Sequence, residues 1–553
     1  MESVGTAQEP PHPAPSGLAR GRIGAVSAAL FGVAAAAPIA TVVTVVTVSP
    51  PVLAAGAGPL AALSVVAVAV VLLLFGTPYA AMIRRTPHAG ATYPQLARGL
   101  GRPAALVGAW LALAGYHAIQ FGLYALLGQA AAPLLHSWFG VTAPWWLVAG
   151  AGWLLVTLGG LLRVEFAAGV IALLTVAETA VLAGLAAAGV LRPAGGAPIR
   201  TGTYLITDPA RLDRSLLGLL LAVAVLAFVG FETAATYAEE TRDPRRTAGR
   251  AARGAVLLLA LLLAGVTWSL IVAAGPAGVA GRAAARGPEL LFALAGERLA
   301  PWAVTLARLM LVTGLLAAIL AVHHALARYL YALGRERVLP GVLGNVSPRT
   351  GAPRAAALTQ SLVAGAALTG AYLAGATASA RTARALVVGG GLAILVLLLL
   401  TAVAALLHLN RVPAREGVGT RFFAPVLSIV SLGVLLYLAG RDLAALLAVR
   451  AGSPWVSVVL GALAGCLAIG LAHALVLRLA DPVRYAGIGL GGAALVITPQ
   501  PGPAAEQPTG NPRTWAAPPG DAPEEPADAP AGLPRQRTPG AHRPERVHPE
   551  ING

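Results

Sequence analysis

Two glutamates stand apart from the other acidic residues of this chain because long apolar runs surround them. Glu178 lies within VIALLTVAETAVLAGLAA, and Glu232 lies within LAFVGFETAATYAEE. An ionised carboxylate in the middle of a membrane-spanning helix costs at least about 2.5–3.5 kcal/mol, so each glutamate needs a partner or a function. Glu178 is therefore either a protonatable group or counter-charge for a cationic ligand, or a structural hydrogen-bond partner inside a helix bundle.

A glycine accompanies the second of these glutamates. Gly230 is a weak helical position two residues before Glu232. Thr233 and Thr236 follow, and their hydroxyls can satisfy backbone groups that a helix break would free. This stretch is either a broken helix whose carbonyls and carboxylate meet a ligand, or a continuous helix with a glycine packing site.

The first apolar run, AALFGVAAAAPIATVVTVV, has a proline near its centre. Pro38 removes one helix hydrogen bond and clashes with the preceding turn. The alanines before it leave room for a neighbour or a ligand to approach the backbone, although a simple proline kink would give the same pattern. The interrupted runs are the first and the sixth of the chain, and interruptions at corresponding positions of two halves point to a transporter binding site.

A polar stripe follows the third apolar run. Tyr116, Gln120 and Tyr124 recur every four residues and therefore share one helix face, with His117 beside them. We expect this face to look into the bundle, where it either lines a site or bridges helices.

Other chemistry is scarce in the sequence. His323 and His324 are adjacent, so they point in different directions, and no further ligand lies one helical turn away. The sequence contains no P-loop pattern and no HExxH or serine–histidine arrangement. We therefore expect no metal, no cofactor and no enzymatic activity.

The composition identifies the environment of the apolar runs. The chain has 553 residues, of which 57% are hydrophobic and 11% charged, and its mean hydropathy is +0.75. A soluble globular chain carries about 25% charged residues, so the composition favours a lipid bilayer. All 39 basic residues are arginines that lie mostly between the apolar runs, which argues against nucleic-acid binding despite a net charge of +16. The single cysteine, Cys466, excludes a disulfide scaffold.

Twelve apolar runs have the length of about 20 residues that a membrane-spanning helix needs. They cover roughly Ile23–Val48, Leu60–Tyr79, Ala104–Leu135, Trp145–Leu162, Phe166–Leu191, Leu216–Tyr237, Ala255–Ala274, Trp302–Tyr331, Ala355–Ala374, Leu386–Asn410, Ala424–Gly440 and Trp455–Leu477. Between the seventh and eighth runs, Glu289–Glu297 could form a short helix over the entrance to the bundle.

Arginine placement predicts the orientation, because positively charged loops stay in the cytoplasm. With both termini inside, the inside segments hold 21 arginines and the outside segments hold 11. We therefore expect a multi-pass protein of the cell membrane, an inner membrane in bacteria, with both termini cytoplasmic. Residues 1–21 and 481–553 should be disordered cytoplasmic ends, since the latter range is rich in proline and poor in aliphatic residues.

Three stretches resemble a known family. AFVGFETAATYAEETRDPRRT, residues 227–247, is similar to the sixth-helix signature of the amino acid–polyamine–organocation (APC) permeases, in which a glycine–phenylalanine–glutamate break precedes paired glutamates and a basic loop. HAGATYPQLARGLGRPAALVGAW resembles the family's loop from helix 2 into helix 3. ARYLYALGRERVLPGVLGNVSPRTGAPRAAALT resembles its segment from helix 8 to helix 9. The resemblance runs in order over about residues 20–480.

This resemblance implies an all-α, polytopic membrane fold of about 12 transmembrane helices. Two inverted five-helix repeats of the leucine-transporter type, with helices 1 and 6 broken, would be followed by two additional helices. The transporter domain would cover 22–480, with repeat one at about 22–192, repeat two at about 215–412 and helices 11–12 at about 423–479.

The resemblance also implies a substrate site between the unwound parts of helices 1 and 6. Backbone N–H groups at the first break would meet a carboxylate, and carbonyls at the second would receive an ammonium group, which agrees with the polarity of helix ends. The candidate substrate-binding residues are Ala35, Ala36, Ala37, Pro38, Phe228, Val229, Gly230, Phe231, Glu232, Tyr116 and Gln120.

The chain departs from the family at two places. The first helix has AAAAP where relatives usually have a glycine-rich, GSGIF-like run. Many relatives carry a lysine on the fifth helix that is linked to proton coupling, whereas this chain has no lysine and offers Glu178 nearby. Glu178 is therefore the candidate coupling residue, which either takes the proton itself or pairs with a cationic part of the substrate.

Together these features predict a secondary active transporter for an amino acid or a related amine. It would work by alternating access, coupled to a proton or to a counter-substrate, within the lipid bilayer, and the sequence leaves its oligomeric state open. A polyamine or other organic-cation exchanger is one alternative. A membrane amino acid sensor that does not transport, and that signals through the proline-rich tail, is the other.

Overall fold

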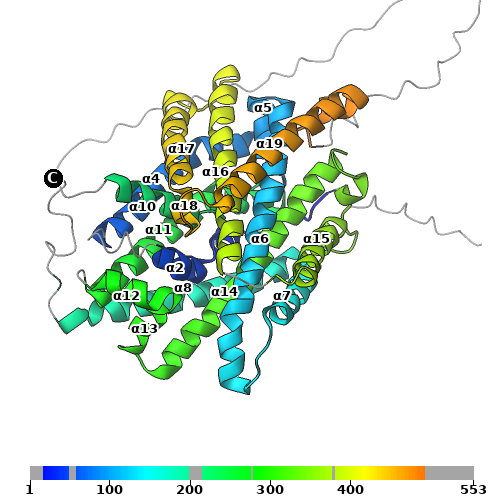
Figure 1. Ribbon diagram of the computed structural model, residues 1–553. Coiled ribbons are helices and arrows are strands. Elements are labelled where there is room, and N and C mark those ends of the chain that lie inside the picture. The colour runs from blue at the N-terminus through cyan, green and yellow to red at the C-terminus, as the bar shows by residue number, and fades with distance from the viewer. Residues whose placement is uncertain are drawn as a thin grey trace, which may run out of the picture. The chain divides into compact units, whose positions relative to one another are not determined.

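The computed structural model describes residues 17–48, 58–196, 199, 214–275, 278–376 and 380–491. Regular structure in these residues is helical, as predicted, and the β contact among them is an isolated parallel bridge between Ile23 and Thr241 (Figure 1). The helices and helical turns are α1 (Ala25–Ala35), α2 (Pro38–Val48), α4 (Gly58–Arg85), α5 (Tyr93–Gly99), α6 (Arg102–Phe139), α7 (Trp145–Gly160), α8 (Val164–Leu191), η1 (Ala194–Gly196), α10 (Arg214–Ala227), η3 (Phe231–Glu240), α11 (Thr247–Ala274), α12 (Val279–Arg286), η4 (Gly287–Glu289), α13 (Leu290–Gly296), α14 (Pro301–Arg335), η5 (Gly341–Gly344), α15 (Arg354–Leu373), α16 (Ala380–Arg411), η6 (Gly419–Phe423), α17 (Ala424–Arg441), α18 (Leu443–Leu446), α19 (Pro454–Ala480) and α20 (Pro482–Gly487).

The predicted spans correspond to these helices one by one. Eleven helical stretches in the described part of the chain are long and apolar enough to cross a membrane, and the fold class of a polytopic all-α protein is confirmed. The fourth predicted span is α7, which is apolar but has 16 residues. The first span is divided into α1 and α2, and the sixth into α10 and η3.

The long helix α6 packs against α16, α14 and α19. These four helices are labelled in Figure 1. The contact with α16 is close because both helices present glycine there: a Cβ at Gly390 would lie 2.5 Å from the carbonyl oxygen of Gly115. Small residues let helix backbones approach in this way inside a membrane. On the other side of the bundle, α11 packs against α4, α1, α8 and η3.

Short elements cover the two ends of the bundle. Helix α13 lies within the predicted range Glu289–Glu297 and packs against the start of α14. Near the N-terminus, Leu18 is buried and the Ala19 N–H donates to the Gly351 carbonyl, at 3.3 Å. Helix α20 falls inside the range predicted as tail, and the rest of both predicted disordered ends, residues 1–16 and 492–553, lies outside the described residues.

Candidate functional site

The first helix break lies where the proline was expected to interrupt the chain. Helix α1 ends at Ala35, and α2 begins at Pro38, which suits the first position of a helix because it needs no N–H partner there. Between them Ala37 has a φ of +46°, a left-handed conformation that L-residues rarely adopt. The N–H groups of Ala36 and Ala37 still bond to the last turn of α1, at 3.2 and 2.8 Å.

The second break lies at the predicted glycine. Helix α10 ends at Ala227, and η3 begins at Phe231 after Gly230, which has a φ of +121°. A Cβ at Gly230 would lie 2.6 Å from the Ala36 nitrogen, so only glycine fits here and the two breaks are in backbone contact. The Thr233 N–H and hydroxyl both donate to the Gly230 carbonyl, at 3.0 and 2.6 Å, as the sequence suggested.

Glu232 folds back onto the break beside it. Its Oε1 accepts a hydrogen bond from the Tyr116 hydroxyl at 2.8 Å, and its Oε2 accepts one from the Gly230 N–H at 3.0 Å. The side chain is buried, and no cationic side chain pairs with it in the described part of the chain. Two predicted site residues from α6 and η3 thus meet at the second break.

Glu178 of α8 forms a hydrogen bond next to the first break. Its Oε1 accepts a hydrogen bond from the Ile39 N–H at 2.7 Å, which is the first N–H of α2, while Oε2 has no partner among the described residues. The carboxylate packs against Gly314 of α14, where a Cβ would lie 2.7 Å from the Glu178 carboxyl carbon. A negative charge at a helix N-terminus is favourable, so Glu178 caps α2.

Gln120 bonds to helices other than the two broken ones. The Gln360 amide of α15 donates to its Oε1, and its Nε2 donates to the Ile319 carbonyl of α14 at 3.5 Å. Of the two interpretations for the polar stripe, Gln120 therefore bridges helices, whereas Tyr116 reaches the break. His323 and His324 are buried in α14, and no group of three His, Cys, Asp or Glu side chains in the described residues could hold a metal ion.

A cavity of about 320 Å³ extends from one end of the bundle to residues that flank both breaks, and the predicted substrate-binding residues are not among those that line it. Ala40 and Thr41 of α2 line it beside the first break, and Leu226 and Ala227 of α10 line it beside the second. At its other end it meets the ion pair of Glu289 with Arg308, whose side chains are 51% and 31% exposed. We call this end of the molecule, marked by Glu289, Arg308 and Arg384, the cavity end.

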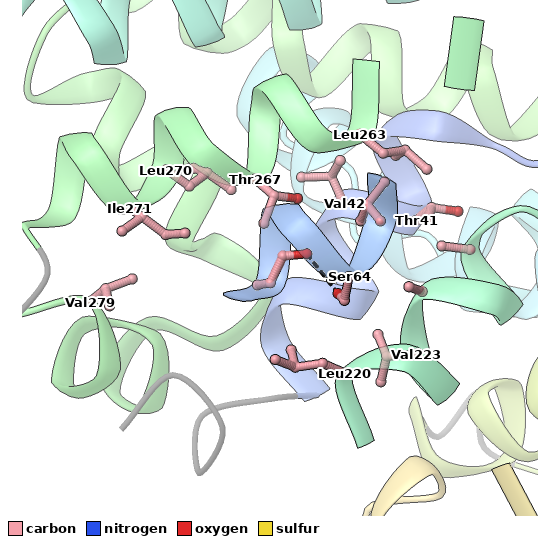
Figure 2. A pocket seen from close by; sticks show the side chains of 14 residues that line it. Thr41, Val42, Ser64, Leu220, Val223, Leu263, Thr267, Leu270, Ile271 and Val279 are labelled. Atoms are coloured by element: carbon pink, nitrogen blue, oxygen red, sulfur yellow. Dashed lines mark hydrogen bonds between the residues drawn. The ribbon is translucent and has the colours of Figure 1, made fainter. Parts of the chain in front are cut away.

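A smaller apolar pocket of about 40 Å³ adjoins this cavity. It shares Thr41, Val223 and Ala227 with the cavity and extends between α2, α4, α10 and α11. Figure 2 shows Leu263, Thr267, Leu270 and Ile271 of α11 on one side and Leu220 and Val223 of α10 on the other. The cavity and the smaller pocket therefore both leave free space beside α2 and α10, the parts of the broken helices that line them.

The opposite end is held together by buried ionic contacts. Arg328 of α14 donates to both carboxylate oxygens of Glu240, at 2.5 and 2.9 Å, and each side chain is 1% exposed. About two turns further towards the C-terminus of α14, Arg335 binds both oxygens of Glu239, at 2.7 and 2.8 Å. We call this end, marked by Glu239, Glu240, Arg328, Arg335 and Glu336, the closed end.

Glu336 joins two further segments at the closed end. It accepts hydrogen bonds from the Tyr93 hydroxyl at 2.6 Å and from the Gly489 and Gly491 N–H groups at 2.8 and 2.6 Å. Burial alone would raise the pKa of this carboxyl, but these donors and the nearby His88 hold it below its usual value. Burial raises the pKa of the Tyr93 hydroxyl well above its usual value, with the Glu336 charge adding to the effect.

The sequence did not predict these contacts at the closed end. The residues lie in two of the stretches that carry the family resemblance, as the paired glutamates after the second break and the basic residues of ARYLYALGRE. Their spacing along the chain, 88 residues between Glu240 and Arg328, hides the pairing. The signal that could have indicated the pairing was the presence of both acidic and basic residues within or next to apolar stretches.

The first and sixth spans of this helical bundle are broken, and the two breaks are in backbone contact. This arrangement is typical of membrane transporters with discontinuous helices. The chain belongs to the amino acid permease family, whose sequence model matches residues 23–454.

Three relatives illustrate what this chain is similar to. An uncharacterized transporter of Mycobacterium tuberculosis is 34% identical over 165 residues, 29% of this chain and 36% of the relative. The low-affinity putrescine importer PlaP of Escherichia coli K12 is 26% identical over 298 residues, 52% of this chain and 62% of the importer. The branched-chain amino acid permease BcaP of Lactococcus lactis is 31% identical over 144 residues, 26% of this chain and 30% of the permease. The chain thus spans less than two thirds of the length of each of these curated relatives.

Proposed function

We propose that this chain is a secondary active transporter, not an enzyme, which moves an amino acid or a related amine across the cytoplasmic membrane by alternating access. The observation that carries the proposal is the backbone contact between the two helix breaks at the inner end of a cavity. Breaks of this kind leave helix ends that bind charged groups within a membrane. Family membership and the names of the relatives support the same class of function.

In this proposal the substrate binds at the two breaks. The carbonyls of Phe228 and Val229 receive an ammonium group, because carbonyls at a helix break attract cations. The Gly230 carbonyl takes part only when the Thr233 N–H and hydroxyl release it. Glu232 adds a negative charge there, and Tyr116 fixes its carboxylate. Of the other predicted site residues, Ala35 to Pro38 and Phe231 form the two helix ends at this site, and Gln120 bridges helices instead.

Glu178 is the proposed coupling group. As a carboxylate it caps α2 through the Ile39 N–H. A proton on this carboxyl would remove the charge at the helix end and weaken the cap. The proton would thereby change the position of α2 relative to α8 and α14, which is the motion that alternating access requires.

We further propose that the closed end faces the cytoplasm, because the arginine distribution puts both termini there. Residues 22–192 and 215–412 then form the two inverted repeats, and helices 11–12 at 423–479 complete the transporter domain. Substrate enters at the cavity end and leaves when the closed end separates.

An exchanger of polyamines or other organic cations is the second candidate function. The match to the putrescine importer covers more of this chain than the other two matches. In addition, neither Glu178 nor Glu232 is paired with a cationic side chain among the described residues. A buried carboxylate without a partner is costly, and a cationic substrate would supply one.

Reconstitution in liposomes tests the proposal. With an inward proton gradient, we expect uptake of radiolabelled leucine, ornithine or putrescine, and loss of that uptake in Glu232→Gln with normal expression. Glu297→Gln, which removes a carboxylate that is 49% exposed, is the matched control and should leave uptake unchanged. Ornithine uptake without putrescine uptake favours the amino acid carrier, and the reverse favours the exchanger. Absence of uptake for a broad set of amino acids and amines would contradict the proposal.

A further inference from the structure

Three charged side chains line the cavity, and only two of them neutralise each other. Glu289 and Arg308 form an ion pair through both nitrogens and both oxygens. Arg384 of α16 lines the same cavity and is half-buried, and no acidic side chain pairs with it in the described part of the chain. Among the described residues that line the cavity, Arg384 is therefore a positive charge without an acidic partner.

The position of Arg384 along α16 places it at the outer part of the cavity. Seven residues further along the helix, Gly391 packs against Leu226, where a Cβ would lie 2.8 Å from the Leu226 side chain. Leu226 belongs to the last turn of α10, directly before the second break. At a rise of about 1.5 Å per residue, Arg384 lies about 10 Å from the level of that break. Helical side chains lean towards the N-terminus, which takes the guanidinium further outwards.

The groups expected to bind a substrate carboxylate at the first break are already occupied. The N–H groups of Ala36 and Ala37 bond to the last turn of α1, and Pro38 has none. The next N–H, of Ile39, bonds to the Glu178 carboxylate. An incoming carboxylate would therefore have to displace the Glu178 side chain from Ile39, so a cation elsewhere in the cavity is the better receptor.

We infer that Arg384 forms an outer subsite that receives the carboxylate of an incoming substrate. This inference rests on the proposed transport function and narrows its substrate to carboxylate-bearing amines, that is, amino acids. The planar guanidinium binds a carboxylate through two parallel hydrogen bonds, and a ligand carboxylate compensates the cost of leaving an arginine half-buried among apolar side chains.

The distance to the breaks defines what the subsite does. Because Arg384 lies about 10 Å outwards from the level of the second break, an incoming amino acid meets Arg384 before it meets the break. Arg384 therefore acts on capture of the substrate, before the substrate moves inwards. A positive charge in a cavity with apolar walls raises the local concentration of anionic groups, and added salt weakens this effect.

The test compares amino acids with their decarboxylated counterparts in the same liposomes. We would measure uptake kinetics for the transported compound and inhibition constants for the pairs leucine and 3-methylbutylamine, and ornithine and putrescine. In Arg384→Gln we expect the KM or inhibition constant of the amino acids to rise about fivefold at low ionic strength, with kcat unchanged. The amines should change less than twofold, and about 0.5 M salt should abolish the difference. Arg384→Lys should retain part of the preference.

Arg381→Gln is the matched control, because Arg381 lies one turn earlier on α16, is exposed and does not line the cavity. Equal changes for both members of each pair, or no change for either, would overturn the inference while the proposed function stands. A wild-type protein that accepts only the amines would also overturn it. A wild-type protein that accepts none of the four compounds in any assay would instead count against the proposed function.

Discussion

The cavity end and the closed end both contain ion pairs, but these differ in burial. At the closed end the side chains of Arg328 and Glu240 are each 1% exposed. At the cavity end, Arg282 of α12 and Glu297 directly after α13 lie on either side of Glu289 in the sequence, and their side chains are 43% and 49% exposed. A surface pair contributes about 0–1 kcal/mol, whereas removing one partner of a buried pair costs about 3–5 kcal/mol.

This difference indicates which end can rearrange easily. The cavity end can change these contacts at little cost, because the pairs of Glu289 with Arg308 and of Arg282 with Glu297 are accessible to water. The closed end can open only if several buried contacts separate together. Among these contacts, the hydrogen bonds of Glu336 join the end of α14 to α5 and to the segment after α20. We therefore interpret the structure as a state that receives substrate from the cavity end.

The largest expected effect comes from breaking the closed end. Arg328→Gln leaves Glu240 buried without its partner and should lower the free energy of unfolding by about 3–5 kcal/mol. Arg282→Gln at the cavity end should change it by less than about 1 kcal/mol. Denaturant titration of both variants measures the contrast. Equal destabilisation by the two substitutions would show that the two ends do not differ as described.

A smaller effect is expected from Glu336→Gln, which weakens charged hydrogen bonds worth about 1.5–3 kcal/mol. Because the pKa of Glu336 is lower in the folded protein, its carboxylate stabilises the fold above the unfolded pKa of about 4.3. This contribution is lost as the pH falls through the folded pKa. The melting temperature of the wild type should therefore fall more steeply below about pH 4.3 than that of Glu336→Gln. Parallel pH profiles would contradict this role.

Glu178→Gln should affect stability less and pH dependence more. The amide still accepts the Ile39 N–H but loses the charge at the α2 N-terminus, a change of about 1 kcal/mol or less. Uptake in the variant should no longer vary with pH between about 5 and 8, the range in which proton-coupled transport by the wild type should vary. Glu165→Gln, on the same helix in an exposed pair with Arg22, is the control. An unchanged pH profile would return Glu178 to a structural role.

Removal of residues 499–553 should have the smallest effect. The proposed transporter domain ends before this range, so a transporter lacking it should keep its uptake rate and its melting temperature. Liposome uptake by the shortened chain measures this. Normal ligand binding by a full chain that transports nothing would favour the sensor instead.

Local chemistry explains how much of the fold the sequence predicted. Pro38 and Gly230 act on their own backbone, so both helix breaks could be predicted from residue type and spacing. The apolar runs predicted the spans for the same reason, because hydrophobicity over about 20 residues is a local property.

Contacts between distant residues explain what the sequence could not predict. The cap on α2 joins Ile39 to Glu178 across 139 residues, and the pair at the closed end joins Glu240 to Arg328 across 88. Glu178 stood out as a buried carboxylate, but its partner depends on how α8 packs against α2. Gln120 is a similar case, because the sequence showed its polar stripe but could not show its hydrogen-bond partners on α14 and α15.

The central claim is that the two ends open in alternation, and cysteine accessibility tests it most directly. In a Cys466→Ala background, Ala227→Cys lies in the cavity, and Ala235→Cys lies buried in η3 towards the closed end. A membrane-impermeant thiol reagent on the cavity side should label Ala227→Cys, and a saturating transported substrate on that side should reduce this labelling. The same substrate should expose Ala235→Cys to reagent on the opposite side. Labelling of both positions from one side, or labelling that substrate does not change, would contradict the claim.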